Sequence, residues 1–329
     1  MSNSIIEIKD LSKKFGKFTA VNSVNFAIKE GELFGLLGPN GAGKTTTISM
    51  LSTILKPTSG NATINGNDLK HQDAIRRSIG VVFQDPSLDD ELTAKENLEF
   101  HGRMYHMPVE LRKKRIGEVL KLVNLDDKAS SKVKTFSGGM KRRLEIARGL
   151  MHHPKVLFLD EPTLGLDPQT RRSIWDYVKK LNEEEKLTII LTTHYMEEAD
   201  FLCNRIAIID HGKIIALDTP DALKNIMGGD VITLETPDAE ELKKILKFKW
   251  IKSMKTHDDK LSITVKNGEK VIAKIIGVVC NKKMQISSVS LKKPTLEDVF
   301  LHYTGKTIRE QEASSIDEMR ARFKRGMRR

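Results

Sequence analysis

Nine consecutive residues decide the fold of this chain: Gly38, Pro39, Asn40, Gly41, Ala42, Gly43, Lys44, Thr45 and Thr46. An apolar run of strand length precedes them at 33–37, and a helical pattern follows from Thr46. A strand, a glycine-rich loop and a helix in this order cradle phosphate groups, because backbone N–H groups and the positive end of the helix dipole point to one place. We expect all nine residues to line a nucleotide-phosphate site.

Two residues of this loop have separate expected roles. Lys44 reaches the β- and γ-phosphates as a point charge, and Thr45 offers a hydroxyl to Mg²⁺. The loop therefore predicts a nucleoside triphosphate that is bound together with Mg²⁺.

Length and composition bound the rest of the chain. Its 329 residues suffice for an α/β domain of roughly 200 residues and a smaller second domain. The only two cysteines, Cys203 and Cys280, form no pairing motif. They fit a reducing cytosol, argue against a disulfide scaffold or a zinc site, and are expected to be small core residues.

The sequence shows neither a secretion signal at its start nor eighteen consecutive apolar residues, so we do not expect it to span a membrane. Its net charge of +11 suits an anionic partner, either nucleic acid or an acidic lipid surface. Six of the last ten residues are Arg or Lys, so much of this excess is local. Charge alone does not choose between the two partners.

Strands are predicted over 5–11 and 24–28, with a basic, glycine-broken turn over 13–18. Phe15 lies in this turn. Its ring can stack on adenine, whereas the alternative is a phenylalanine of the core. Beside a phosphate loop we favour stacking.

A second strand of the core, 79–83, ends at Gln84. Because α/β folds place ligand groups at the carboxyl ends of strands, Gln84 is a candidate to hold either Mg²⁺ or the attacking water. A helical, charged insert is expected to follow, at about 88–150.

Within this insert, Ser137, Gly138 and Gly139 precede the helical stretch 144–150. Ser137 is a good N-cap, and the free N–H groups of such a helix start make a second possible phosphate site. A plain capped helix explains the same residues equally well.

Carboxylates follow the next buried strand, 156–159, at Asp160 and Glu161. Asp160 can reach Mg²⁺ directly or through water, and Glu161 is placed to act as general base on a water that attacks the γ-phosphate. The strand at 188–191 delivers His194 to the same edge, where its ring can hydrogen-bond the γ-phosphate.

In this order, the motifs resemble those of the ATP-binding cassette (ABC) ATPases over roughly residues 5–222. Gly38 to Thr46 resembles the Walker A motif, Gln84 the Q-loop, Ser137 to Met140 the signature, Val156 to Glu161 the Walker B motif, Gly165 to Asp167 the D-loop, His194 the switch histidine and Phe15 the aromatic A-loop. Phe136, Met140 and Phe15 depart from the family's common leucine, glutamine and tyrosine. The resemblance adds Val21 and Asp167 to the expected nucleotide-binding residues.

This resemblance implies a P-loop NTPase fold of the α/β class, a mixed sheet with helices, an antiparallel β subdomain and a helical insert. It also implies that two ATPase domains close head to tail on ATP, each ATP lying between one Walker A motif and the partner's signature. This chain holds one set of motifs, so we expect it to pair with a second copy or a close relative.

The stretches 140–143 and 293–300 look like those of ATPase subunits in drug-resistance exporters similar to the daunorubicin exporter. Such subunits power a separate transmembrane permease, which implies a place at the cytoplasmic face of the membrane. The alternative is a soluble ABC ATPase that acts on nucleic acid or ribosomes. Only the positive charge favours it, and such factors usually carry two cassettes in one chain.

We expect three parts: an ATPase domain at 1–225, a small α+β domain at 226–304 and a basic tail at 305–329. The middle part predicts the order β-α-β-β-α-β, which is ferredoxin-like. It shows no catalytic constellation, so a packing or dimer-stabilising role is favoured over a ligand sensor. The tail is either an amphipathic helix that docks on anionic lipid or the partner subunit, or a disordered segment.

Overall fold

The computed structural model describes residues 4–257, 259–282 and 284–304. They form two compact units that divide between Thr219 and Pro220. We expected this boundary after residue 225, but α8 (Pro220–Asn225) packs against α11 (Leu296–Thr304) and so belongs to the second unit. The basic tail at 305–329 lies outside the described residues. No helix in the described ranges is long and apolar enough to cross a membrane.

The first unit contains a six-stranded sheet in the order β10-β9-β3-β8-β7-β6. Its strands are β3 (Leu33–Leu37), β6 (Ile79–Val82), β7 (Val156–Asp160), β8 (Thr188–Thr193), β9 (Arg205–Asp210) and β10 (Lys213–Asp218). All neighbours run parallel except β10, which is antiparallel to β9. Every residue of β3, β7 and β8 is buried, as their continuous apolar runs predict.

An antiparallel sheet in the order β2-β1-β4-β5 completes the β structure of this unit. It comprises β1 (Ser4–Phe15), β2 (Phe18–Lys29), β4 (Ser59–Ile64) and β5 (Asn67–Asp68). The first two strands are longer than predicted and leave only residues 16–17 as a turn, which Gly16 permits with a φ of 58°. Outside the helical insert, the helices of this unit are α1 (Lys44–Leu51), α2 (Gln72–Ser78), α6 (Pro168–Glu185) and α7 (Met196–Leu202).

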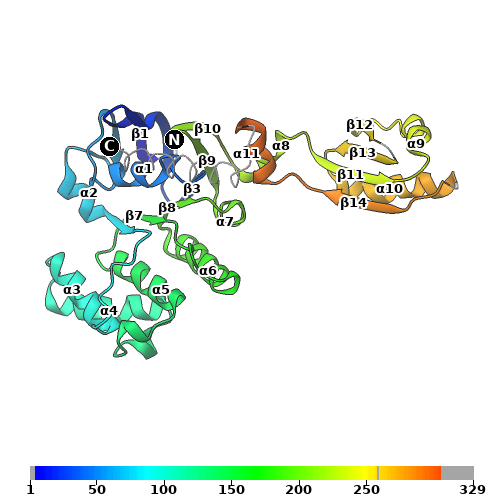
Figure 1. The fold of residues 1–329 in the computed structure, drawn as a ribbon. Helices are drawn as coiled ribbons and strands as arrows, with labels where there is room; N and C mark the ends of the chain where they lie inside the picture. The colour runs from blue at the N-terminus through cyan, green and yellow to red at the C-terminus, as the bar shows by residue number, and fades with distance from the viewer. Residues whose placement is uncertain (1–3, 258, 283, 305–329) are drawn as a thin grey trace, which may run out of the picture. The chain divides into compact units, whose positions relative to one another are not determined.

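The helical insert forms a layer of its own beside the strands of the first unit (Figure 1). It contains α3 (Ala94–Met104), α4 (Val109–Leu122), the short 3-10 helices Asp126–Lys128 and Val133–Thr135, and α5 (Gly138–Gly149). A capping box starts α3, because Thr93 accepts from the backbone of Glu96 while the Glu96 carboxylate accepts from the backbone of Thr93. The predicted fold class, a mixed α/β core with an antiparallel subdomain and a helical insert, is confirmed.

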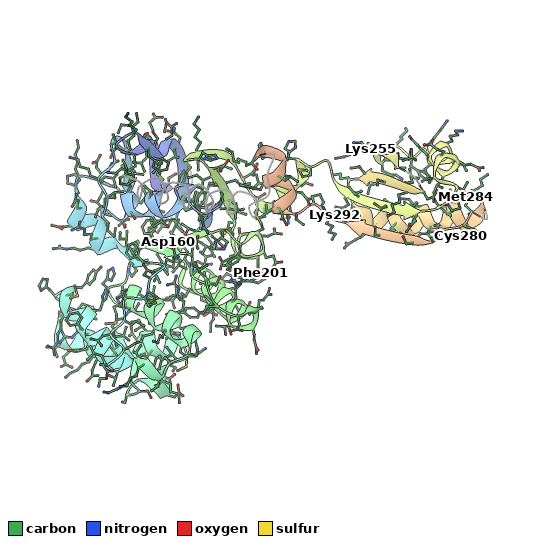
Figure 2. The ribbon with its side chains drawn as sticks, viewed as in Figure 1. Asp160, Phe201, Lys255, Cys280, Met284 and Lys292 are labelled. Atoms are coloured by element: carbon green, nitrogen blue, oxygen red, sulfur yellow. The ribbon has the colours of Figure 1, made fainter. Side chains whose placement is uncertain are left out.

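Between α8 and α11, the second unit has the predicted element order. The elements of this part are β11 (Asp230–Glu235), α9 (Ala239–Ile245), β12 (Ile251–His257), β13 (Lys260–Val265), α10 (Gly268–Asn281) and β14 (Ser288–Lys292). The strands pair antiparallel in the order β12-β13-β11-β14, which is the ferredoxin-like arrangement. Cys203 of the first unit is buried, but Cys280 is exposed on α10, so its expected core role is wrong (Figure 2).

Candidate active site

The phosphate loop joins β3 to α1 and fits closely against neighbouring strands. At Gly43, which has a φ of 106°, a Cβ atom would lie 2.5 Å from the carbonyl oxygen of Ala20. At Gly38 a Cβ atom would lie 2.2 Å from the carbonyl oxygen of Ile209. Only glycine allows the left-handed conformation at Gly43 and the close approaches at both positions, so the loop conformation depends on these two residues.

The side chain of Lys44 is buried at the centre of the loop. Its ammonium donates to the carbonyl oxygens of Gly38 at 2.8 Å and Pro39 at 3.1 Å. It also lies 3.1 Å from a carboxylate oxygen of Glu161, at the end of β7. These contacts hold a positive charge between the loop and the strand that carries the acidic residues.

Glu161 connects Lys44 to the predicted switch histidine. One carboxylate oxygen contacts Lys44, and the other lies 3.2 Å from Nδ1 of His194. Burial raises the pKa of the Glu161 carboxyl, but His194 and Lys44 together outweigh it and hold the pKa below its usual value. Glu161 therefore stays ionised in a buried place, which is the state that a general base needs.

The backbone of Glu161 is also held in an unusual conformation. Its φ is 46°, in the left-handed region that side chains other than glycine rarely adopt. Its N–H donates to the backbone oxygen of Thr192 at 3.1 Å and to the Thr192 hydroxyl at 3.0 Å. Such a conformation persists only where surrounding contacts enforce it, and here it accompanies the carboxylate that the sequence predicts to be the general base.

Asp160 precedes Glu161 and is completely buried, with one oxygen accepting from the Thr192 hydroxyl. Its second oxygen, Oδ2, is buried and has no hydrogen-bond partner. A buried carboxylate oxygen without a partner is costly and suits a hard cation such as Mg²⁺. Figure 2 places Asp160 where the strands of the first unit meet the helical insert.

A cavity of about 450 Å³ lies over the phosphate loop. It is lined by Phe15, Phe18, Ala20, Asn40, Gly41, Gly43, Lys44, Thr45, Thr46, Gln84, Glu161 and Leu164. The fold thus brings the predicted A-loop aromatic, phosphate loop, Q-loop and general base together. Val21 is fully buried in the core and does not line this cavity, whereas its neighbour Ala20 does.

The signature and D-loop residues lie outside this cavity. Ser137 caps α5 by accepting from the N–H of Met140, and Ser137 and Gly138 are exposed. Asp167 is exposed and caps α6 by accepting from the N–H of Thr170 at 3.0 Å. Ser137, Gly138, Gly139 and Asp167 do not line the cavity over the phosphate loop of their own chain.

Family comparisons agree with these motifs. Residues 21–164 match the family model described as ABC transporter, and residues 219–304 match the ATP-binding protein DrrA1-3-like, C-terminal domain. The linearmycin resistance ATP-binding protein LnrL of Bacillus subtilis is 42% identical over 93% of this chain and 100% of that protein. This chain belongs to the ABC transporter family.

Other relatives and solved structures place this ABC ATPase more narrowly. The daunorubicin resistance ATP-binding protein DrrA3 of Streptomyces coeruleorubidus is 37% identical over 95% of this chain and 100% of that protein. The ATP-binding cassette MJ0796, solved as a dimer in a post-hydrolysis state with ADP and Pi, matches with a TM-score of 0.58 at 35% identity, over 65% of this chain and 98% of that chain. The predicted resemblance to drug-resistance ATPase subunits and the predicted ATP hydrolysis are confirmed.

Sequence reasoning missed an arginine that links three motifs of this ABC ATPase. Arg142 of α5 is buried and pairs with Glu145 at 2.9 Å. Its guanidinium donates to the carbonyl oxygens of Phe83 at 2.7 Å, Asp160 at 2.9 Å and Pro162 at 2.8 Å. It therefore joins the signature helix to the residues beside Gln84 and Glu161. The only sequence signal was an i,i+3 pair of opposite charges on an amphipathic helix.

A second missed residue is Glu198 of α7, whose side chain is completely buried. Its carboxylate accepts from the Thr163 hydroxyl at 2.7 Å and the Trp175 indole N–H at 2.8 Å. Burial raises the pKa of this carboxyl above its usual value. Glu198 ties the turn after Glu161 to α6, and the sequence offered no signal because it lies among other acidic residues at the start of a helix.

Proposed function

We propose that this chain is the ATP-hydrolysing subunit of an exporter, which pairs head to tail with a second copy or a close relative to drive a separate membrane permease. One observation carries the proposal. Ser137 and Gly138 are exposed and do not line the cavity that holds Lys44, although Gly138 lines a smaller pocket with Gln84 and Glu161. A partner's signature residues would complete this cavity, so closure on ATP is the mechanical stroke and hydrolysis resets it.

Lys44 and Glu161 line the cavity, His194 contacts Glu161 from behind it, and these groups have distinct proposed roles. Lys44 neutralises the terminal phosphates, Glu161 takes a proton from the attacking water, and His194 orients the γ-phosphate and Glu161. Thr45, Gln84 and Asp160 are the residues that would hold Mg²⁺, supported by the unpartnered oxygen of Asp160. The ion, when bound, offsets the charge that develops on the phosphate oxygens.

We propose that the permease contacts the helical insert and the adjacent core. A pocket of about 180 Å³ lies there, lined by residues that include Ile54, Arg76, His101, Tyr105 and His152. Beside it, α3 exposes Phe100 and Met104, and Ile54 is 61% exposed. Exposed apolar side chains around a pocket are typical of protein interfaces.

The cargo is proposed to be a drug-like, lipid-like or other hydrophobic compound, because the similar proteins are named for resistance to linearmycin and daunorubicin. The permease would hold the chain at the cytoplasmic face of the membrane. A contact of the tail at 305–329 with anionic lipid stays a hypothesis, because that segment lies outside the described residues.

The test is a tagged Glu161→Gln chain used as bait with ATP and Mg²⁺ in detergent-solubilised membranes and cytosol of the native cell. Glu161→Gln keeps ATP binding but stops turnover, so partners of the closed state accumulate. We expect a polytopic membrane protein to co-purify, and Lys44→Ala bait to lose the ATP-dependent part of its recovery. Ribosomes or nucleic acid without a permease would instead support the alternative function.

A further inference from the structure

A second aromatic side chain lies beside the expected adenine-stacking residue. Phe15 is the last residue of β1 and Phe18 the first of β2, and the two are directly paired across the two-residue turn. Residues that face each other in this way project from the same side of the ribbon with their Cβ atoms about 5 Å apart. Both residues line the cavity over the phosphate loop.

Both rings are exposed although they are large and apolar. Phe15 is 49% exposed and Phe18 is 58% exposed, whereas most phenylalanines are buried. Lys13 restrains Phe15, because its ammonium lies 5.2 Å from the ring centroid and donates to the Lys56 carbonyl oxygen at 2.7 Å. Phe18 has no ring contact of this kind among the described residues. Its apolar surface is thus left open to whatever enters the cavity.

We propose that Phe18 is a second base-contacting residue, which together with Phe15 forms an aromatic wall for the adenine and favours large bases over small ones. This inference rests on nucleotide occupying the cavity over the phosphate loop. The phosphates bind at Lys44 and the loop N–H groups, so a base attached through the ribose extends toward the hairpin. A flat, polarisable base gains from a second aromatic surface, and a purine gains more than a pyrimidine because it covers more of that surface.

The experiment compares the affinities of the full chain for ADP, CDP and pyrophosphate in the presence of Mg²⁺, by calorimetry. These ligands are not hydrolysed by an ATPase, and pyrophosphate reports the phosphate loop without a base. The variants are Phe18→Ala, Phe18→Tyr as the aromatic rescue, and Tyr303→Ala as a control. Tyr303 is an aromatic of the second unit that is 42% exposed and lines none of the cavities described above.

We expect Phe18→Ala to raise the Kd for ADP about tenfold, the change that corresponds to roughly 1.4 kcal/mol of lost stacking. The Kd for CDP should rise less, the Kd for pyrophosphate should stay unchanged, and Phe18→Tyr should restore ADP binding. An unchanged Kd for ADP would overturn the proposal. An equal rise for pyrophosphate would also overturn it, because the ring would then act on the loop rather than on the base.

A separate variant tests whether the cavity binds nucleotide at all, independently of the role of Phe18. Lys44→Ala should weaken both ADP and pyrophosphate binding, since it removes the charge that both ligands meet. If Lys44→Ala lowers both affinities while Phe18→Ala lowers neither, the nucleotide cavity stands and only the second aromatic contact is wrong. If Lys44→Ala has no effect on either ligand, the cavity itself is misassigned.

Discussion

The two units of this chain bury different kinds of side chain. The buried charged residues of the described ranges all lie in the first unit: Glu32, Lys44, Arg112, Arg142, Glu145, Asp160, Glu161 and Glu198. Among its described residues, the second unit buries a single polar residue, Thr236, within a core of aliphatic side chains such as Ile232, Leu234 and Ile263. Both units combine sheets with helices, so the difference lies in what fills their interiors.

This difference separates chemistry from packing. A buried charge is costly unless it is paired or used, so a unit that retains many of them is organised around a reaction. Apolar packing alone stabilises a fold but does not carry out a reaction. Substitutions in the first unit should therefore change activity or break ionic pairs, whereas substitutions in the second should change stability alone.

The largest expected effect is on turnover. Glu161→Gln should lower the rate of phosphate release by at least about 100-fold, because the general base is lost while the Lys44 contact to nucleotide remains. ATP binding, measured by equilibrium dialysis, should be retained. Glu184→Gln, an exposed glutamate of α6, is the matched control and should turn over at the parent rate. Hydrolysis by Glu161→Gln at that rate would remove the base assignment.

The next effect is on the stability of the first unit. Arg142→Met should lower the free energy of unfolding by about 3–5 kcal/mol, because it leaves the Glu145 carboxylate buried without its positively charged partner. Urea unfolding measures this change. The double variant Arg142→Met, Glu145→Met should recover part of the loss, since no unpaired charge remains. A double variant as unstable as the sum of both single variants would show that the two residues act independently.

A substitution that creates a cavity in the second unit tests whether changes there affect stability alone. Ile263→Ala should lower the free energy of unfolding of this unit by about 2–5 kcal/mol, because Ile263 is completely buried in its core. ATP turnover below the unfolding temperature should be unchanged. Thermal unfolding and phosphate release in one sample measure both quantities. A parallel fall in turnover would show that the second unit contributes to the reaction.

The smallest effect concerns pH and Glu198. Its raised pKa means that, above the unfolded value of 4.5, the folded chain retains a proton that the unfolded chain has lost. The stability that this proton provides is complete below that value and is lost as the pH rises through the folded pKa. Glu198→Gln keeps an acceptor for Thr163 and Trp175 but does not titrate. Relative to this variant, the parent should become less stable to urea as the pH rises, and a constant difference would contradict the raised pKa.

The sequence indicated that several residues of the candidate site would lie close together, because they stand at strand ends. Lys44, Glu161 and His194 each follow an apolar strand of the same sheet, and parallel strands bring their carboxyl ends to one edge. The ferredoxin-like order was also predictable, since alternating strands and amphipathic helices have different periods. Such features depend on local pattern and on a few general rules of topology.

Side-chain contacts across elements were not predictable in the same way. Arg142 appeared as one residue in a basic run, and its three carbonyl partners come from two distant stretches of the chain, at Phe83 and at 160–162. Val21 was assigned to nucleotide by resemblance, yet strand alternation turns its side chain into the core and leaves Ala20 at the cavity. The register of a strand decides such details, and register follows from tertiary pairing.

The pairing of β11 with β14 has a consequence for how the chain is assembled. Val231, near the start of the first strand of the second unit's sheet, is paired with Lys292 at the end of its last strand. The two ends of the segment 230–292 therefore lie side by side. Gly228 and Gly229, with φ values of 94° and 122°, precede this segment, and Pro294 follows it. A short linker between these neighbouring ends could therefore replace the whole segment. The segment could then be removed, or exchanged with that of a relative, without a change in the path of the rest of the chain.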